Sequence, residues 1–165
     1  MLTKPKLIQR RAQPYVAIRT KVSIPFGALL APMWDEVHVW LVSRGLSAAG
    51  APFIRYLTTD METRLDIEVG FPVAAAMTGD GRISAGILPA GRYAVLEYTG
   101  PYEGEGVFKA NVAMMEWAME KDIVWQISTK DKVEWWGARM EIYLTDPASE
   151  PDPNKWQTEL AFLVA

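Results

Sequence analysis

The order of residue patterns in the first half of this chain recurs in its second half, and this repetition restricts the folds that the chain can adopt. Each half holds an alternating run, then apolar residues at helical spacing, then two further alternating runs. The first copy covers residues 15–73 and the second covers residues 93–164. We therefore expect two strand-helix-strand-strand units that superpose about an approximate twofold axis.

Individual residues match between the two copies in the same order along the chain. The matches are Tyr15 with Tyr93, Trp40 with Trp117, Tyr56 with Tyr143 in two "YLT" triplets, and Glu68 with Glu159. The prediction is a single α+β domain over residues 1–165, with repeat halves at about 8–76 and 81–165. We expect an antiparallel sheet, both helices on one face of that sheet, and a ligand groove between the halves.

Charge and residue usage exclude several classes of function. The chain has 17 basic and 20 acidic residues and no basic cluster that would neutralise phosphates, so we expect no direct nucleic-acid partner. It has no cysteine, which excludes disulfides and thiolate chemistry. Residues 1–11 lack the apolar core of a signal peptide, and no apolar run is long enough to cross a membrane, which predicts a cytoplasmic protein. The sequence shows no nucleotide-cofactor fingerprint and no spacing typical of a metal site, so we expect neither cofactor nor metal.

The alternating stretch "ARMEIYLTDP" contains a carboxylate that one copy of the repeat lacks. Alternation would put Met140 and Ile142 under the helices and turn Glu141 to the opposite face of the sheet. The first copy has Ile54 where the second copy has Glu141. The repeated architecture therefore does not require a carboxylate at this position.

If the two halves face each other, their faces without helices would form a groove along the pseudo-twofold axis. The predicted ligand-binding residues of this groove are Tyr15, Tyr56, Tyr93, Glu141 and Tyr143, with Trp135 and Glu97 added by strand parity. A carboxylate in an apolar groove loses hydration, which raises its pKa unless a cation or hydrogen bonds compensate. Glu141 would then suit either of two roles, pairing with a cationic ligand or acting as a general base toward water.

Structural alternatives compete with these assignments. Glu141 could instead be a strand residue that faces solvent and has no role in binding. Most of the seven tryptophans are expected to be core residues, because Trp34 and Trp117, for example, fit helix faces. Glu68 and Glu159 occupy equivalent places, which favours a structural role repeated in each half.

Several motifs occur in order along most of the chain. They are "EVGFPV" at residues 68–73, "LPAGRYAVLEYTGPYE" at 88–103, "EIYLTDP" at 141–147 and the closing "WQTELAFLVA". In this combination the chain resembles the GyrI-like family, which includes the effector-binding domains of AraC- and MerR-type multidrug regulators. The resemblance implies a duplicated fold with a hydrophobic ligand groove. It also implies that an acidic residue at the position of Glu141 attracts lipophilic cations at the floor of an aromatic pocket.

The resemblance implies a set of functions as well. Because the first strand already begins near Tyr15, we expect a stand-alone member without a preceding helix-turn-helix domain. The main expectation is a protein that binds lipophilic, aromatic and often cationic small molecules, as in multidrug binding or toxin resistance. The alternative is a hydrolase of cyclopropane-bearing DNA-alkylating compounds, with Glu141 as general base assisted by Tyr143 or Tyr102. A third role, inhibition of DNA gyrase, would need an acidic surface patch or tail, and residues 146–155 offer only a short Pro-rich loop.

Overall fold

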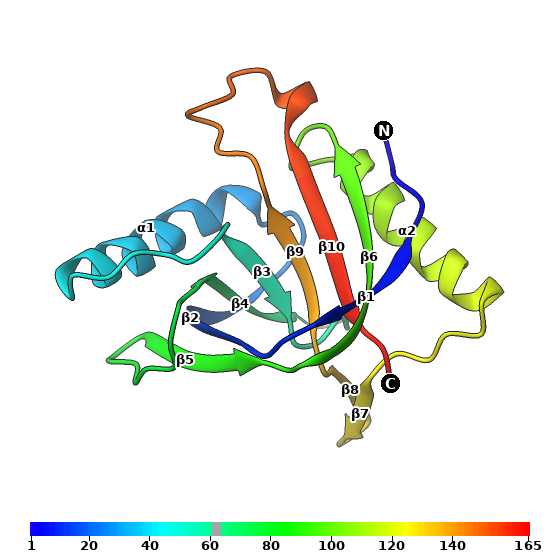
Figure 1. The fold of residues 1–165 in the computed structure, drawn as a ribbon, viewed down its shortest axis with the longest axis horizontal. Helices are drawn as coiled ribbons and strands as arrows, with labels where there is room; N and C mark the ends of the chain where they lie inside the picture. The colour runs from blue at the N-terminus through cyan, green and yellow to red at the C-terminus, as the bar shows by residue number, and fades with distance from the viewer. Residues whose placement is uncertain (61–63) are drawn as a thin grey trace.

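A computed structural model of the chain describes residues 1–60 and 64–165, which fold into one large antiparallel sheet, a small hairpin and two helices (Figure 1). The strands are β1 (Lys6–Arg10), β2 (Gln13–Val22), β3 (Phe53–Tyr56), β4 (Leu65–Pro72), β5 (Ile83–Leu88), β6 (Gly91–Thr99), β7 (Ile127–Lys130), β8 (Val133–Trp136), β9 (Arg139–Tyr143) and β10 (Gln157–Leu163). The helices are α1 (Gly27–Ser43) and α2 (Glu105–Glu120), with one 3₁₀ turn, η1 (Pro153–Lys155). The predicted α+β class is confirmed.

The strands of the main sheet follow an order that is symmetric about its centre. The order is β1-β6-β10-β9-β3-β4-β2-β5, so β9 and β3, the equivalent strands of the two halves, lie side by side in the middle. The register pairs between these two strands are Phe53–Ile142, Ile54–Glu141 and Arg55–Met140. The pseudo-twofold axis therefore passes through the Ile54–Glu141 pair, and the two residues that the repeat aligns are direct neighbours.

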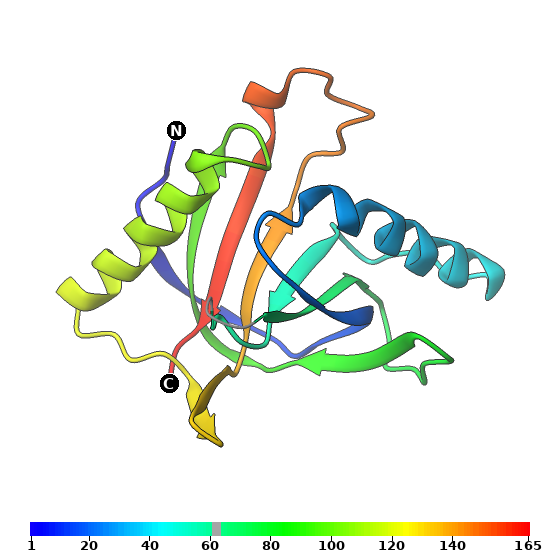
Figure 2. The same ribbon diagram turned by 180° about the vertical axis from the view of Figure 1, so that it is seen from behind.

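Both helices cover the same face of the sheet, one over each half, and we call this the helix face (Figure 2). The buried residues of α2 recur every four positions, at Ala110, Met114 and Ala118, which is the spacing of one helix face. The buried residues of α1 are Leu30, Val37 and Leu41. Among the described residues, neither helix is long and apolar enough to cross a membrane.

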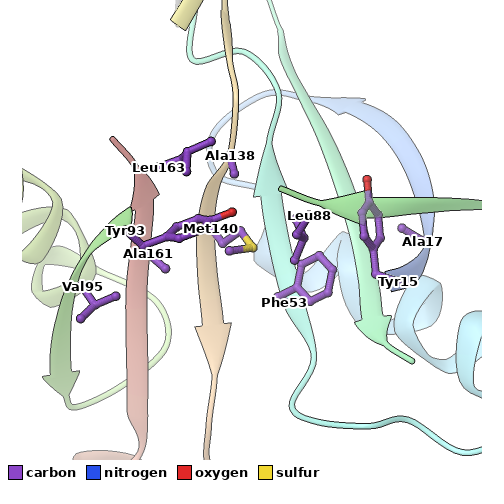
Figure 3. Packing of buried hydrophobic residues seen from close by; sticks show 10 residues of the cluster. All are labelled: Tyr15, Ala17, Phe53, Leu88, Tyr93, Val95, Ala138, Met140, Ala161 and Leu163. Atoms are coloured by element: carbon purple, nitrogen blue, oxygen red, sulfur yellow. The ribbon is translucent and has the colours of Figure 1, made fainter. Parts of the chain in front are cut away.

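The other face of the sheet, the helix-free face, is buried as well, because the sheet bends around its own side chains (Figure 3). Phe53 and Met140 lie in this cluster, at 2% and 3% exposure, and Ile142 packs against it. The prediction that Met140 and Ile142 lie under the helices is therefore wrong. The alternation of residues along β9 could not show which side chains face the helices, because both faces of the sheet are covered by apolar side chains.

The segment between the two halves adds a strand to the first half. The backbones of Asp80 and Ile83 exchange hydrogen bonds of 2.8 and 3.0 Å around Gly81, whose φ of 60° suits glycine. β5 then pairs with β2, and its last residue, Leu88, packs in the cluster of the helix-free face. The linker therefore supplies part of the wall that closes this face.

Candidate functional site

Glu141 is the only charged residue in a row of side chains that crosses the sheet on the helix face. The row follows the strand register from β6 to β5 and consists of Leu96, Leu160, Glu141, Ile54, Val69, Ile18 and Ile83. Glu141 is 7% exposed and every other member is less exposed still. A carboxylate at the centre of such a row is costly unless its oxygens are bonded or its charge is neutralised. The partners of Glu141 therefore decide what this site can do.

Three neutral donors bind the carboxylate of Glu141. The hydroxyl of Tyr143 donates to Oε2 at 2.8 Å, and the side-chain amide of Asn111 donates to Oε1 at 3.5 Å. Tyr56 is the third hydrogen-bonding partner. Since Tyr56 and Tyr143 are equivalent in the repeat, each half delivers one hydroxyl to the same carboxylate. Among residues 1–60 and 64–165, no group of three or more acidic, histidine or cysteine side chains is arranged to hold a metal ion.

A series of aromatic rings adjoins Tyr143, one of the donors to this carboxylate. The ring of Trp34 on α1 meets that of Tyr143 edge-on, with 5.6 Å between centroids. The ring of Tyr102, in the loop before α2, lies 4.9 Å from Tyr143 and 4.8 Å from Trp156. Tyr102 is held by a hydrogen bond from its hydroxyl to the carbonyl of Thr145. We call Trp34, Tyr102, Tyr143 and Trp156 the aromatic cover; they come from a helix, a strand and two loops.

Arg139, the cation closest to Glu141 in sequence, is engaged elsewhere. Its guanidinium carbon lies 4.5 Å from the ring centroid of Trp136 and 4.4 Å from that of Phe162. It also donates to Oδ1 of Asn111 at 3.1 Å, so Asn111 links Arg139 to Glu141. Within the part of the chain that the structure describes, no ion pair joins Glu141 to a basic side chain. The carboxylate is thus surrounded by neutral donors, and the arginine reaches it only through an amide.

Burial dominates the electrostatics of this cluster. Removal from water raises the pKa of Glu141 above its ordinary value, and the hydrogen bonds of Tyr143, Tyr56 and Asn111 and the charge of Arg139 oppose that rise. The pKa values of Tyr56 and Tyr143 are raised well above the ordinary value, chiefly by burial and then by the carboxylate. Both tyrosines therefore keep their protons at neutral pH and can donate. Burial lowers the pKa of Arg139 to about 10, which leaves it charged at neutral pH.

The structure divides the predicted groove residues between the two faces of the sheet. Glu141, Tyr56 and Tyr143 lie together, but on the helix face, which is the face opposite to the one expected. Tyr15 and Tyr93 lie on the helix-free face. The prediction that these two tyrosines share one groove with Glu141 is therefore wrong, because the sheet itself separates them.

On the helix-free face, Tyr15 belongs to a buried polar cluster. Its hydroxyl donates to Oε1 of Glu68 at 2.6 Å and accepts from Nη1 of Arg55 at 2.7 Å. The equivalent hydroxyl, that of Tyr93, instead donates to the carbonyl of Pro89 at 2.7 Å. Both hydroxyls are thus used in contacts within the fold.

Two further predicted residues also lie away from Glu141. Trp135 belongs to the separate β7–β8 hairpin, and the guanidinium carbon of Arg19 lies 5.8 Å from its ring centroid. The parity argument for Trp135 does not hold because β8 and β9 are separate strands. Glu97 lies four residues after Tyr93 on β6 and therefore on the same helix-free face. It does not reach Glu141, which lies on the other face.

Sequence reasoning missed three residues of the site. They are Trp34, Asn111 and Trp156. Helical spacing assigns Trp34 to the core, and nothing in the local sequence marks Asn111. One signal was available, because the alignment that pairs Trp40 with Trp117 also pairs Trp34 with Asn111. Equivalent positions on two helices that flank one axis are expected to face that axis together.

Comparison with solved structures supports this fold. The EcmrR C-terminal domain is similar at 18% identity and a TM-score of 0.73, with 98% of this chain and 96% of that chain covered. An EcmrR chain in a cryo-EM complex with DNA is similar at 18% identity and a TM-score of 0.75, over 99% of this chain, which spans 57% of the length of that EcmrR chain. SAV2435 bound to tetraphenylphosphonium is similar at 14% identity and a TM-score of 0.60, with 99% and 94% of the two chains covered.

The sequence itself identifies the family. No curated protein matches the chain. The family described as GyrI-like small molecule binding domain matches it over residues 3–165, which is nearly its whole length. The motifs quoted above and the arrangement of the strands agree with that match. The chain therefore belongs to the GyrI-like family of small molecule binding domains.

Proposed function

We propose that this domain binds lipophilic aromatic cations over Glu141, between its two helices. The observation that carries the proposal is the place of Glu141 at the centre of an apolar row, with neutral donors and no ion pair among the described residues. The fold does not need this carboxylate, because Ile54 occupies the equivalent place in the other half. A buried carboxylate with a raised pKa is a candidate for a functional group, and a cationic ligand would neutralise it.

A cation whose charge is spread among aromatic groups suits this site better than a compact one. An ammonium group is strongly hydrated, and removing that hydration on burial is costly. A cation shielded by aromatic rings loses little hydration when it leaves water. Its charge would pair with Glu141, and its rings would pack on the π-faces of Trp34, Tyr102 and Tyr143.

Binding requires the aromatic cover to open, because Glu141 is only 7% exposed and these rings pack on one another beside its donor Tyr143. Tyr102 and Trp156 come from loops, and loops change conformation at lower cost than strands do. We expect these two rings to move aside. Tyr56 and Tyr143 lie on or at the central strands, so they would keep the carboxylate in place.

One structural neighbour has been solved with a cation of this class. SAV2435, which shares the fold, has a structure with tetraphenylphosphonium, a cation enclosed by four phenyl groups. At 14% identity this likeness concerns the fold alone. The ligand class for the present chain therefore rests on Glu141 and its surroundings.

The proposal is tested by calorimetric titration with tetraphenylphosphonium and with triphenylphosphine oxide, a neutral compound of related shape. Glu141→Gln keeps the side-chain shape and removes the charge, so we expect cation affinity to fall about ten- to hundredfold and affinity for the neutral compound to change little. Glu97→Gln is the matched control, because it removes a carboxylate from the opposite face of the sheet. Its cation affinity should equal that of the wild type. Equal losses in both variants, or no loss in Glu141→Gln, would contradict the proposal.

The hydrolase alternative is tested with the same variant. A general base must accept a hydrogen bond from a water molecule, and three of the roughly four acceptor positions of the Glu141 carboxylate are already taken by Tyr143, Tyr56 and Asn111. We therefore expect no product from a cyclopropane-bearing alkylator, as followed by mass spectrometry. Turnover in the wild type that falls about 10²–10⁴-fold in Glu141→Gln would instead establish catalysis by this carboxylate.

A further inference from the structure

A cavity of about 350 Å³ lies on the helix-free face, across the sheet from Glu141. Phe53, Leu88, Tyr93 and Met140 form its floor, and each is at most 6% exposed. These side chains come from both halves and from the linker strand, and Figure 3 shows them on one face of the sheet. The volume lies near the lower end of the range for small-molecule pockets, which is about 300–1,000 Å³. The cavity is therefore of a size for a small ligand.

The rim of this cavity is positively charged. Arg10 and Arg11 line it, and no acidic side chain of the described residues does. Arg10 forms an ion pair with Glu159, so its charge is balanced. Arg11 is exposed and has no ion pair within the described part of the chain. One uncompensated positive charge thus stands beside an apolar floor.

The two uncharged polar side chains of the wall, those of Tyr93 and Gln13, already donate hydrogen bonds within the fold. The hydroxyl of Tyr93 donates to the carbonyl of Pro89 at 2.7 Å. The side-chain amide of Gln13 donates to the carbonyls of Pro14 and Val73, at 2.9 Å each. The body of a ligand would therefore meet apolar groups, and only a head group at the rim would meet a charge.

We infer that this cavity binds a small monocarboxylate with an apolar body. The carboxylate lies at Arg11, where the charge is uncompensated, and the body packs on Phe53, Tyr93 and Met140. Arginine is suited to this contact because its guanidinium matches a carboxylate in geometry and charge. The site selects a ligand of opposite charge to the one proposed for Glu141.

Strand β9 separates the two sites. Met140 and Ile142 line the cavity, whereas Glu141, the residue between them, faces the helices. Successive residues of a strand point to opposite faces of a sheet, so ligands at the two sites are separated by the sheet itself. A variant at one site can therefore leave the contacts of the other site intact.

The test uses the full chain with decanoate and 1-naphthoate as probes, and decyltrimethylammonium as a probe of opposite charge. Binding is followed by NMR of the Met140 and Ile142 methyl groups and by calorimetry. We expect saturable methyl shifts and intermolecular NOEs to Met140 with at least one carboxylate, and none with the ammonium compound. A response to decanoate alone would identify aliphatic acids as the ligand class, and a response to 1-naphthoate alone would identify aromatic acids.

Variants then locate the ligand. Arg11→Gln should weaken carboxylate binding about three- to tenfold, since the guanidinium is exposed and its contact is screened by water. Arg92→Gln, which removes an exposed arginine outside the cavity lining, is the matched control and should change nothing. Ala12→Trp places a large ring at the rim and should weaken binding more than about tenfold by filling the entrance. Glu141→Gln should leave carboxylate affinity unchanged.

Three results would overturn the inference. One is the absence of saturable shifts at Met140 and Ile142 with either carboxylate. The second is an equal loss of affinity in Arg11→Gln and Arg92→Gln. The third is a set of NOEs to Trp34 or Tyr56 in place of Met140, because the ligand would then occupy the helix face. If Ala12→Trp does not fold, the NOEs measured on the wild type decide the matter on their own.

Discussion

The two halves of this domain share a scaffold but differ in polarity at the axis that relates them. At the centre of the sheet the first half places Ile54 and the second half places Glu141, and the two are direct register neighbours. Both are nearly buried, at 2% and 7% exposure. Since the same architecture accepts isoleucine at one of these positions, it does not require a carboxylate at the other. A difference between equivalent buried positions therefore indicates function more clearly than either residue does alone.

The halves also contribute different chemistry to the surroundings of Glu141. The first half supplies Trp34 and Tyr56, and the second supplies Asn111 and Tyr143. The tyrosines are equivalent and both bond the carboxylate, whereas the helix positions offer an indole in one half and an amide in the other. A symmetric frame thus holds an asymmetric site, with an indole at the helix position of one half and an amide at the equivalent position of the other.

A second carboxylate at the axis should have the largest effect. In Ile54→Glu, two buried carboxylates would face each other with β-carbons about 5 Å apart, and both could not ionise. We expect the free energy of unfolding at pH 7, measured by urea denaturation, to fall by about 3–5 kcal/mol. Ile54→Gln has the same shape without the charge and should lose less. Equal losses in the two variants would mean that packing alone distinguishes the halves at this position.

Removal of either tyrosine hydroxyl should have a smaller effect that is similar for the two halves. Tyr56→Phe and Tyr143→Phe each withdraw one donor from the buried carboxylate, which should lower the free energy of unfolding by about 1–3 kcal/mol at neutral pH. In a Glu141→Gln background both losses should shrink, as measured by double-mutant cycles. A loss that is undiminished in that background would show that the hydroxyl serves some other contact.

Glu141 should also make stability depend on pH. Because its pKa in the folded state is raised above 4.5, the folded protein holds the proton more tightly than the unfolded chain does. The contribution of Glu141 to stability is therefore least unfavourable below pH 4.5 and becomes more unfavourable as pH rises through the raised pKa. The slope is at most about 1.4 kcal/mol per pH unit. Urea denaturation of the wild type and of Glu141→Gln across this pH range measures the slope. A difference in the free energy of unfolding between the two proteins that stays constant with pH would refute the prediction.

Charges on the outer surfaces of the two halves should have the smallest effect. Arg82 pairs with Glu36 in the first half at 3.5 Å, and Lys109 pairs with Glu105 in the second at 3.9 Å. All four side chains are at least 45% exposed. Arg82→Gln and Lys109→Gln should each change the free energy of unfolding by less than about 0.5 kcal/mol, because water screens such pairs. A larger change in only one variant would show that the halves also differ in the strength of their surface ion pairs, and not only at the central Ile54–Glu141 positions.

The sequence was sufficient to predict the fold but not the composition of the site. The two "YLT" triplets correctly made Tyr56 and Tyr143 equivalent, and the repeat correctly aligned Ile54 with Glu141. Helical spacing and alternation are local properties, and the order of strands follows from two copies of one unit meeting at a shared axis. The motifs that resemble the GyrI-like family also extend over almost the whole chain.

The face of the sheet on which Glu141 lies could not be predicted, because that depends on contacts between distant segments. Met140 and Ile142 are apolar, and apolar residues were expected to face the helices. In the structure they face a second core that Leu88 of the linker and Ile8 of β1 help to close. Trp156 was missed for a similar reason, since only the folded loops bring it against Tyr102. Such contacts between segments far apart in sequence leave no periodic pattern.

Carbon-13 NMR of the Glu141 carboxyl group, titrated with pH with and without saturating tetraphenylphosphonium, tests the central claim most directly. In the free protein we predict a midpoint above the ordinary value of 4.5, because burial dominates. A bound cation favours the ionised carboxylate, so the midpoint should fall when the ligand is present. A midpoint that stays unchanged under saturating ligand would contradict the claim that the cation pairs with Glu141.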